Sequence, residues 1–171
     1  PEPSRNVVFR DHFGNAVHHV AIERAHDAFS VVLEAEVEIA RPDPALLADG
    51  PAWEGVAASM RNDGFPQHPQ VAEFAYASPQ AAPDHEATAF AAASFLPGRG
   101  VVEGVRDLTT RIRRDFAYVP GSTDISTPVA QVMRIRKGVC QDFAHVMIAG
   151  LRGLGLPARY ASGYLRTYAP A

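Results

Sequence analysis

One cysteine stands where the sequence around it favours reactivity. Cys140 is the only cysteine of the 171 residues, and it follows Gly138 at the start of a strongly apolar segment that is predicted to be helical. The unpaired amides and the dipole at the N-terminus of a helix stabilise a thiolate, which is the nucleophilic form of cysteine. The alternative interpretation of Cys140 is a small buried apolar side chain.

A cysteine nucleophile needs a base, normally a histidine that a third group holds in place. His145 lies five residues on, so its side chain points about 140° around a helix from Cys140, at roughly 100° per residue. We therefore interpret His145 as a packing residue with local hydrogen bonds. Asp142 points about 200° away by the same geometry. Its carboxylate complements the dipole at the helix start, so we assign it a structural role.

The other histidines do not suggest a metal or cofactor site. They are His12, His18, His19 and His26 in the segment expected to form strands, and His68 and His85 in loops. Neighbouring strand residues point to opposite faces, so His18 and His19 are a poor pair of metal ligands. One cysteine also excludes a multi-cysteine zinc site and an internal disulfide. We expect no metal and no cofactor.

The elements that must position Cys140 are predicted to be helices. Short helices are expected at 51–60, 69–77 and 84–95, the last with Asp84 as its N-cap. Residues 101–117 carry an apolar stripe, which leaves the arginines at positions 106, 111, 113 and 114 on a solvated face.

Two further helices complete this expectation. Thr127 is expected to cap a helix with Pro128 at its first position, ending near residues 137–138. The segment 140–154 is apolar around nearly its whole circumference, which predicts a central, buried helix. Gly155 is expected to end it, and a strand is expected over 158–165.

The N-terminal part has a different pattern. Residues 11–15 form a turn cluster, and a β-hairpin is expected over 16–39. Apolar residues alternate with Glu34, Glu36 and Glu38 in its second half, which is typical of a strand with one solvated face. We therefore divide the chain into an antiparallel-strand region, 1–41, and a mainly helical region, 42–171.

Composition excludes several classes of protein. The residues are 47% hydrophobic and 20% charged, with a net charge of −3, which excludes a disordered tail. Residues 1–100 hold 14 acids and 6 bases (−8), and residues 101–171 hold 5 acids and 10 bases (+5). The pI of about 6.2 and the spacing of the bases argue against nucleic acid. No segment is long and apolar enough for a bilayer, and no signal segment opens the sequence. We therefore expect no membrane partner and a cytoplasmic location.

Three runs in the C-terminal half carry a family resemblance. They are FAYVPG at 116–121, RKGVCQDFAH at 136–145 and LRGLGLPARYASGYL at 151–165. Together they resemble the bacterial transglutaminase-like superfamily, and within it the transglutaminase-like cysteine proteases. The DHFGN run at 11–15 resembles the end of the β-rich N-terminal region of the same proteins.

The resemblance implies an α+β fold with a papain-like core, in which the nucleophilic cysteine opens a buried helix packed on a β-sheet. Only Cys140 matches a catalytic residue of the family. The histidine and aspartate of the family's triad lie in segments beyond residue 171, so we interpret the chain as a fragment that is inactive alone. The backbone amide of Cys140 is expected to donate to the oxyanion, and Tyr118 is a candidate second donor.

The implied reaction is acyl transfer from a peptide or protein substrate, with a Cys–His–Asp triad and a thioester intermediate. Hydrolysis by a protease or amidase is the favoured outcome, and protein cross-linking is an alternative that shares the same intermediate. A non-catalytic peptide-binding or scaffolding module of the same fold is a further alternative. A last alternative is that the basic C-terminal half binds an acidic partner. The oligomeric state is left open.

Overall fold

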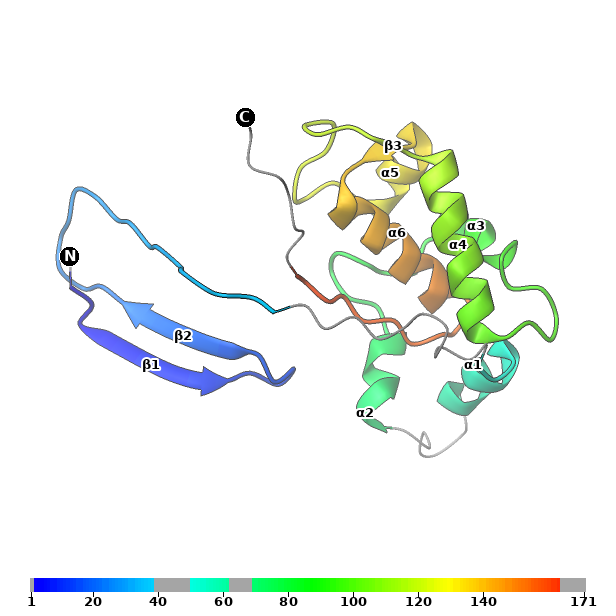
Figure 1. Cartoon of the computed structure of the whole chain (residues 1–171), viewed down its shortest axis with the longest axis horizontal. Coiled ribbons are helices and arrows are strands. Elements are labelled where there is room, and N and C mark those ends of the chain that lie inside the picture. The colour runs from blue at the N-terminus through cyan, green and yellow to red at the C-terminus, as the bar shows by residue number, and fades with distance from the viewer. Residues whose placement is uncertain (1, 39–49, 62–68, 164–171) are drawn as a thin grey trace. The chain divides into compact units, whose positions relative to one another are not determined.

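The computed structural model describes residues 2–38, 50–61 and 69–163. Contacts between Cα atoms divide the chain into two compact units, Pro1–Arg41 and Pro42–Ala171. The first holds strands and the second is mainly helical, with short strands (Figure 1).

A β-hairpin forms the regular secondary structure described in the first unit. Strand β1 (Arg5–Arg10) pairs antiparallel with β2 (Ala16–Ala21), so that Arg10 faces Ala16 and Arg5 faces Ala21. The Asp11 carboxylate accepts hydrogen bonds from the amides of Phe13 (2.9 Å) and Asn15 (2.8 Å). These bonds fix the turn that the sequence predicted at 11–15.

The predicted hairpin over 16–39 is wrong in its second strand. The first strand is present as β2, but its partner is β1 on the N-terminal side, and residues 28–38 pair with no strand among the described residues. Residue 39 lies outside the described residues. Alternation shows which side chains share a face, but a strand also needs a neighbour for its backbone hydrogen bonds.

The second unit contains the elements that surround Cys140. Its helices are α1 (Trp53–Arg61), α2 (Pro69–Ala72), η2 (Glu73–Ala75), α3 (His85–Ala92), α4 (Val101–Asp115), α5 (Val129–Ile135) and α6 (Cys140–Gly153). Two-residue strands β3 (Ala117–Tyr118) and β4 (Lys137–Gly138) pair in parallel. The predicted helices are therefore all present, with ends shifted by a few residues.

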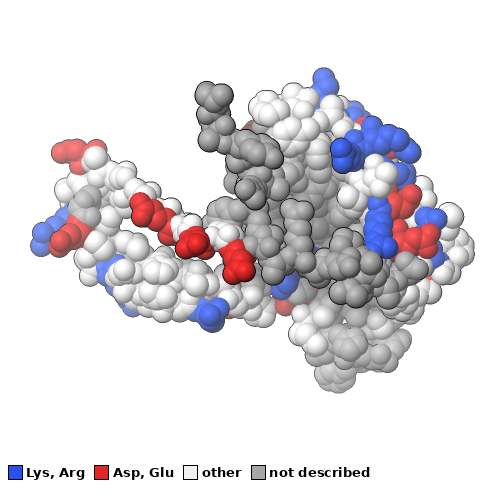
Figure 2. Space-filling view, viewed as in Figure 1, with Lys and Arg blue, Asp and Glu red and all other residues white. Residues whose placement is uncertain are grey.

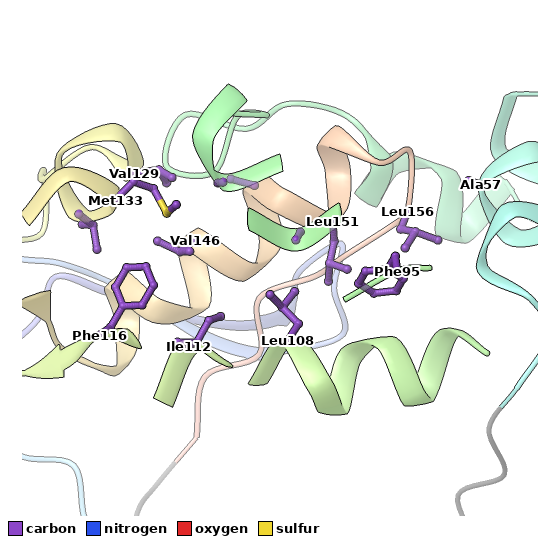
Figure 3. Packing of buried hydrophobic residues seen from close by; sticks show 14 residues of the cluster. Ala57, Phe95, Leu108, Ile112, Phe116, Val129, Met133, Val146, Leu151 and Leu156 are labelled. Carbon is purple, nitrogen blue, oxygen red and sulfur yellow. The ribbon is translucent and has the colours of Figure 1, made fainter. Parts of the chain in front are cut away.

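One apolar core joins these helices. Leu108 and Ile112 of α4, Met133 of α5 and Val146 of α6 are buried in it, and Figure 3 shows their side chains converging between the helices. Helix α3 packs closely on α6 at Gly150. The approach is so close that a Cβ at position 150 would lie 2.7 Å from the carbonyl oxygen of Ala87. A side chain at position 150 would force these two helices apart.

One of the predicted helix N-caps is confirmed and another is wrong. The Asp84 carboxylate accepts the amide of Ala87 (2.9 Å) at the start of α3, as predicted. Pro128, not Thr127, is the N-cap of α5. The Thr127 hydroxyl instead accepts the amide of Asp124 (2.9 Å), so it closes the preceding turn.

Two further predictions need correction. Residues 158–163 form no strand, and residues 164–165 lie outside the described residues. Arg111 is not on a solvated face, because its guanidinium donates to the Phe90 carbonyl (2.7 Å) and to Ser94 Oγ (2.8 Å) and lies 4.2 Å from the centroid of the Phe90 ring. A long side chain with a polar end can cross to a neighbouring element, which a helical periodicity does not reveal.

Candidate functional site

The short strands bring two distant loops together at the start of α6. In the parallel pair, Ala117 lies opposite Lys137 and Tyr118 opposite Gly138. The amide of Val119 donates to the carbonyl of Gly138 (2.9 Å), which extends the pairing by one residue. Tyr118 is thereby held beside the segment that leads into Cys140.

A buried carboxylate fixes the first turn of α6. Asp142 is 3% exposed, and its Oδ2 accepts the amide of Val139 (2.7 Å) and the hydroxyl of Thr123 (2.6 Å). Val139 is the N-cap, so the first bond is the half of a capping box in which the third helical residue reaches back. The structural role predicted for Asp142 agrees with this geometry, and the carboxylate also ties the 119–124 loop to the helix.

Gly138 is required by the same carboxylate. A Cβ built at Gly138 would lie 2.7 Å from Asp142 Oδ2 and 2.8 Å from the Cβ of Asp142. Any larger residue at position 138 therefore displaces the group that holds the amide of Val139. This explains physically why a glycine lies two residues before the cysteine.

Cys140 is exposed at the first position of α6, which contradicts the alternative interpretation of a buried packing residue. Its backbone amide has no hydrogen-bond acceptor in the described part of the chain, whereas the preceding amide is occupied by Asp142. The thiol and an unused amide therefore belong to one residue at the positive end of the helix dipole. An amide in this position can donate to an oxyanion that forms beside the sulfur.

An open cavity of about 460 Å³ adjoins Cys140, between α4, β3 and α6. Its wall is mainly apolar and consists of Ile112, Phe116, Phe143, Ala144 and Met147. Thr109, Arg113, Tyr118 and Cys140 complete the lining. The ring of Phe143 contacts those of Phe116 (centroids 5.7 Å apart) and Tyr118 (6.4 Å) edge-on, which holds this wall in place.

The structure brings Cys140 and Tyr118 to one cavity and leaves His145 outside it. The His145 ring packs on Tyr160, with centroids 5.6 Å apart. Burial lowers the pKa of His145, and the nearby Asp142 carboxylate partly opposes this shift. The contact with Tyr160 agrees with the packing role that the angular position of His145 predicted.

The cavity itself was not predicted, although the sequence contains its signal. Cys140, Phe143, Ala144 and Met147 are spaced i, i+3, i+4 and i+7, which places them on one face of α6. Since other faces of this helix are also apolar, the pattern did not show which one is uncovered. The central, buried helix predicted from the sequence is present, since Val146 and the residues from Ile148 to Leu151 are buried, but its first two turns border the open cavity and Cys140 is exposed there.

Comparison with known proteins gives a consistent result. A sequence model described as the transglutaminase-like superfamily matches residues 73–170. Uncharacterized proteins of Mycobacterium bovis and Mycobacterium tuberculosis are 39% identical over 173 residues, which cover 99% of this chain and 54% of theirs. An uncharacterized Mycobacterium leprae protein is 26% identical over 162 residues, covering 95% of this chain and 55% of its own. The chain thus spans about half the length of these relatives, and no solved structure matches.

The mixed helix-and-strand architecture predicted from the sequence is confirmed, with a strand pair in the first unit and a mainly helical second unit. Within the described ranges, no helix has the length and apolar character needed to cross a membrane.

Proposed function

Because the chain belongs to the transglutaminase-like superfamily, which includes cysteine-dependent enzymes, we propose that it carries the nucleophile of a cysteine-dependent acyl-transfer enzyme. The observation that supports this proposal is the exposed thiol of Cys140 at the first position of α6, next to an apolar cavity. We propose a peptide or protein as substrate, and hydrolysis as the outcome.

In the proposed reaction, the Cys140 thiolate attacks the carbonyl carbon of an amide. The new S–C bond forms a tetrahedral intermediate, whose oxyanion accepts a hydrogen bond from the unused amide of Cys140. The C–N bond then breaks, and a protonated histidine gives its proton to the leaving amine. Water then attacks the thioester carbonyl while the neutral histidine takes a proton from it, and the C–S bond breaks, which releases the acid and regenerates the thiolate and the protonated histidine.

Three residues of this chain have distinct roles in the proposed reaction. Cys140 is the nucleophile, and Tyr118 is a candidate second donor to the oxyanion because β3 holds it on the same cavity. Asp142 is a positioning residue, since it holds the amide of Val139 and thereby the orientation of the first turn. We place the base histidine and the aspartate that orients it outside these 171 residues, because no histidine lines the cavity in the part of the chain that the structure describes.

The test uses the full natural chain that contains these residues, with 4-nitrophenyl acetate as the acyl donor. We expect a burst of nitrophenol and a peptide map that places the acetyl group on Cys140. Cys140→Ser should reduce turnover by at least about a hundredfold, well within the losses seen when a nucleophile is removed from other acyl-transfer enzymes. His145→Gln is the matched control on the same helix, and it should retain the burst.

Each outcome separates one alternative. Loss of the burst in His145→Gln would contradict the assignment of the base to a residue elsewhere. Transfer of the acyl group to an added amine in preference to water would favour cross-linking over hydrolysis. No acyl adduct on Cys140 in the intact protein would refute the enzyme and favour a binding module.

A further inference from the structure

We propose that Arg113 makes the cavity beside Cys140 selective for an acyl group that combines an apolar part with a carboxylate. The proposal rests on the proposed function only in treating the occupant as the acyl group of the substrate. It follows from the charges and contacts of three arginines near the end of α4, and from the lining of the cavity.

The three arginines differ in what their guanidinium groups contact. The Arg111 guanidinium donates hydrogen bonds to the carbonyl of Phe90 and to Ser94 Oγ. Arg114 forms a two-bond ion pair with Asp115, with distances of 2.6 and 2.9 Å. Arg113 has neither a hydrogen bond nor an ion pair among the residues that the structure describes.

Arg113 is also the only charged side chain in the lining of the cavity, as far as the chain is described. The rest of the wall is an apolar surface formed mainly by Ile112, Phe143 and Met147, and the thiol of Cys140 opens onto the same space. A guanidinium that has no hydrogen-bond or ion-pair partner among the described residues, beside an apolar wall, can bind a ligand that has an apolar body and an anionic group. Arginine suits this role because its planar fork can hold both oxygens of a carboxylate.

The surrounding charges reinforce the attraction of an anion. Residues 101–171 have 10 bases against 5 acids, a net charge of +5. Figure 2 shows Lys and Arg side chains following α4, with acidic side chains beside them. The nearest acid in sequence, Asp115, is paired with Arg114, and Asp142 is buried on Val139 and Thr123. The N-terminus of α6 adds a positive dipole end at the cavity.

A structural explanation for Arg113 is a favourable interaction with the negative end of the α4 dipole. Arg114 lies in the same last turn and shares that interaction, but it does not line the cavity. It therefore serves as the control for the dipole interaction, and it differs from Arg113 in its ion pair with Asp115 and in lying off the cavity.

The experiment compares two alkylating reagents on Cys140 of the intact protein, with the modification at Cys140 quantified by peptide mapping. Iodoacetate carries a carboxylate and iodoacetamide is neutral, so the ratio of their rates reports the attraction of an anion. Arg113→Gln should lower this ratio about threefold, the effect of one unit charge acting at roughly 6 Å through water. Arg114→Gln should leave it within about 1.5-fold, and Arg113→Lys should restore most of it.

Salt provides an independent check, since about 1 M salt reduces the screening length to about 3 Å. The wild-type ratio should then fall towards that of Arg113→Gln. An unchanged ratio in Arg113→Gln, in a protein with an unchanged circular dichroism spectrum, would overturn the proposal. An equal loss in Arg114→Gln would also overturn it, because the effect would then be a general one of charge on α4.

The two proposals fail in different ways. Alkylation needs neither a base histidine nor an acyl donor, so the charge selectivity is measured even if the intact protein forms no acyl adduct. If the adduct forms and the ratio does not respond to Arg113, the proposed function stands without this selectivity. If the ratio responds, the intact protein should hydrolyse peptides with an acidic residue on the acyl side faster than their neutral counterparts, and Arg113→Gln should remove that preference.

Discussion

Removal of the Asp142 carboxylate tests how the start of α6 is held. The group is 3% exposed and accepts two short hydrogen bonds, from the amide of Val139 (2.7 Å) and the hydroxyl of Thr123 (2.6 Å). Asp142→Ala leaves both donors without their acceptor and removes a negative charge from the positive end of the helix dipole. Asp142→Asn keeps the shape and one acceptor oxygen, but removes the charge.

The magnitude follows from these contacts. Hydrogen bonds to a charged group contribute about 1.5–3 kcal/mol each, and the dipole interaction adds about 0.3–1 kcal/mol. Solvent reaching the cavity left by the side chain recovers part of this, so we expect Asp142→Ala to lower the free energy of unfolding by about 3–5 kcal/mol. Asp142→Asn should cost about 1.5–3 kcal/mol, and Thr123→Val, which removes one donor, about 1–2 kcal/mol.

Two measurements decide the outcome. Urea unfolding gives the stability change, and Gln141→Ala is the control because its side chain lies next to Asp142 without sharing its hydrogen bonds. The alkylation rate of Cys140 in the folded protein should fall in Asp142→Ala, because the first turn loses its fixed orientation. A loss of stability below about 1 kcal/mol would refute the reasoning, since the two bonds would then be replaceable by water.

Two further predictions concern half-buried polar groups of α6. Burial lowers the pKa of His145 below its ordinary 6.5, so the unfolded chain binds a proton more readily than the folded one. The free energy of unfolding should therefore fall as the pH drops below about 6.5. Urea unfolding midpoints between pH 8 and 5 should show this fall, and His145→Gln should lessen it. Arg152 donates to the carbonyl oxygens of Phe74 (2.9 Å), Ala81 (2.8 Å) and Ala158 (3.0 Å) and to Ser78 Oγ (2.8 Å). Arg152→Met should therefore lower the melting temperature, with a loss of about 2–4 kcal/mol in the free energy of unfolding. Arg152→Lys should recover little of this loss, because an ammonium group cannot reach acceptors in four directions. Recovery to wild-type stability by lysine would contradict this interpretation.

The sequence predicted the helices of the second unit well because their determinants are local. Asp84 caps α3, Gly155 adopts a positive φ (+83°) just after α6, and the apolar stripe of α4 turns to the core. Caps, turn residues and periodicity act over a few residues. They therefore act in the same way before and after the chain folds.

Features that depend on a distant partner were not predictable in this way. The alternation at 28–38 was interpreted as a hairpin strand, but the partner of β2 is β1 and no described strand pairs with that segment. Arg111 looked like a solvated residue, yet it reaches across to Phe90 and Ser94 on another segment. In both cases the local pattern is correct, and the outcome is decided by what lies beside it in space.

The same limit applies to the candidate site, where it concerns chemistry. The central interpretation of Cys140 needed only a cysteine at a helix start, and local sequence was enough for that. The cavity beside Cys140 could not be predicted from local sequence, because α6 is apolar on nearly every side. The helix packs against α3 and α5 through residues such as Val146, Ala149 and Leu151. The cavity borders only the first two turns, where Cys140 is exposed and Met147 is half-buried, whereas Leu151 on the same face is buried. One helix thus stabilises the core along most of its length and exposes a thiol at its first residue, and its sequence pattern does not show which part of its apolar surface borders an open cavity.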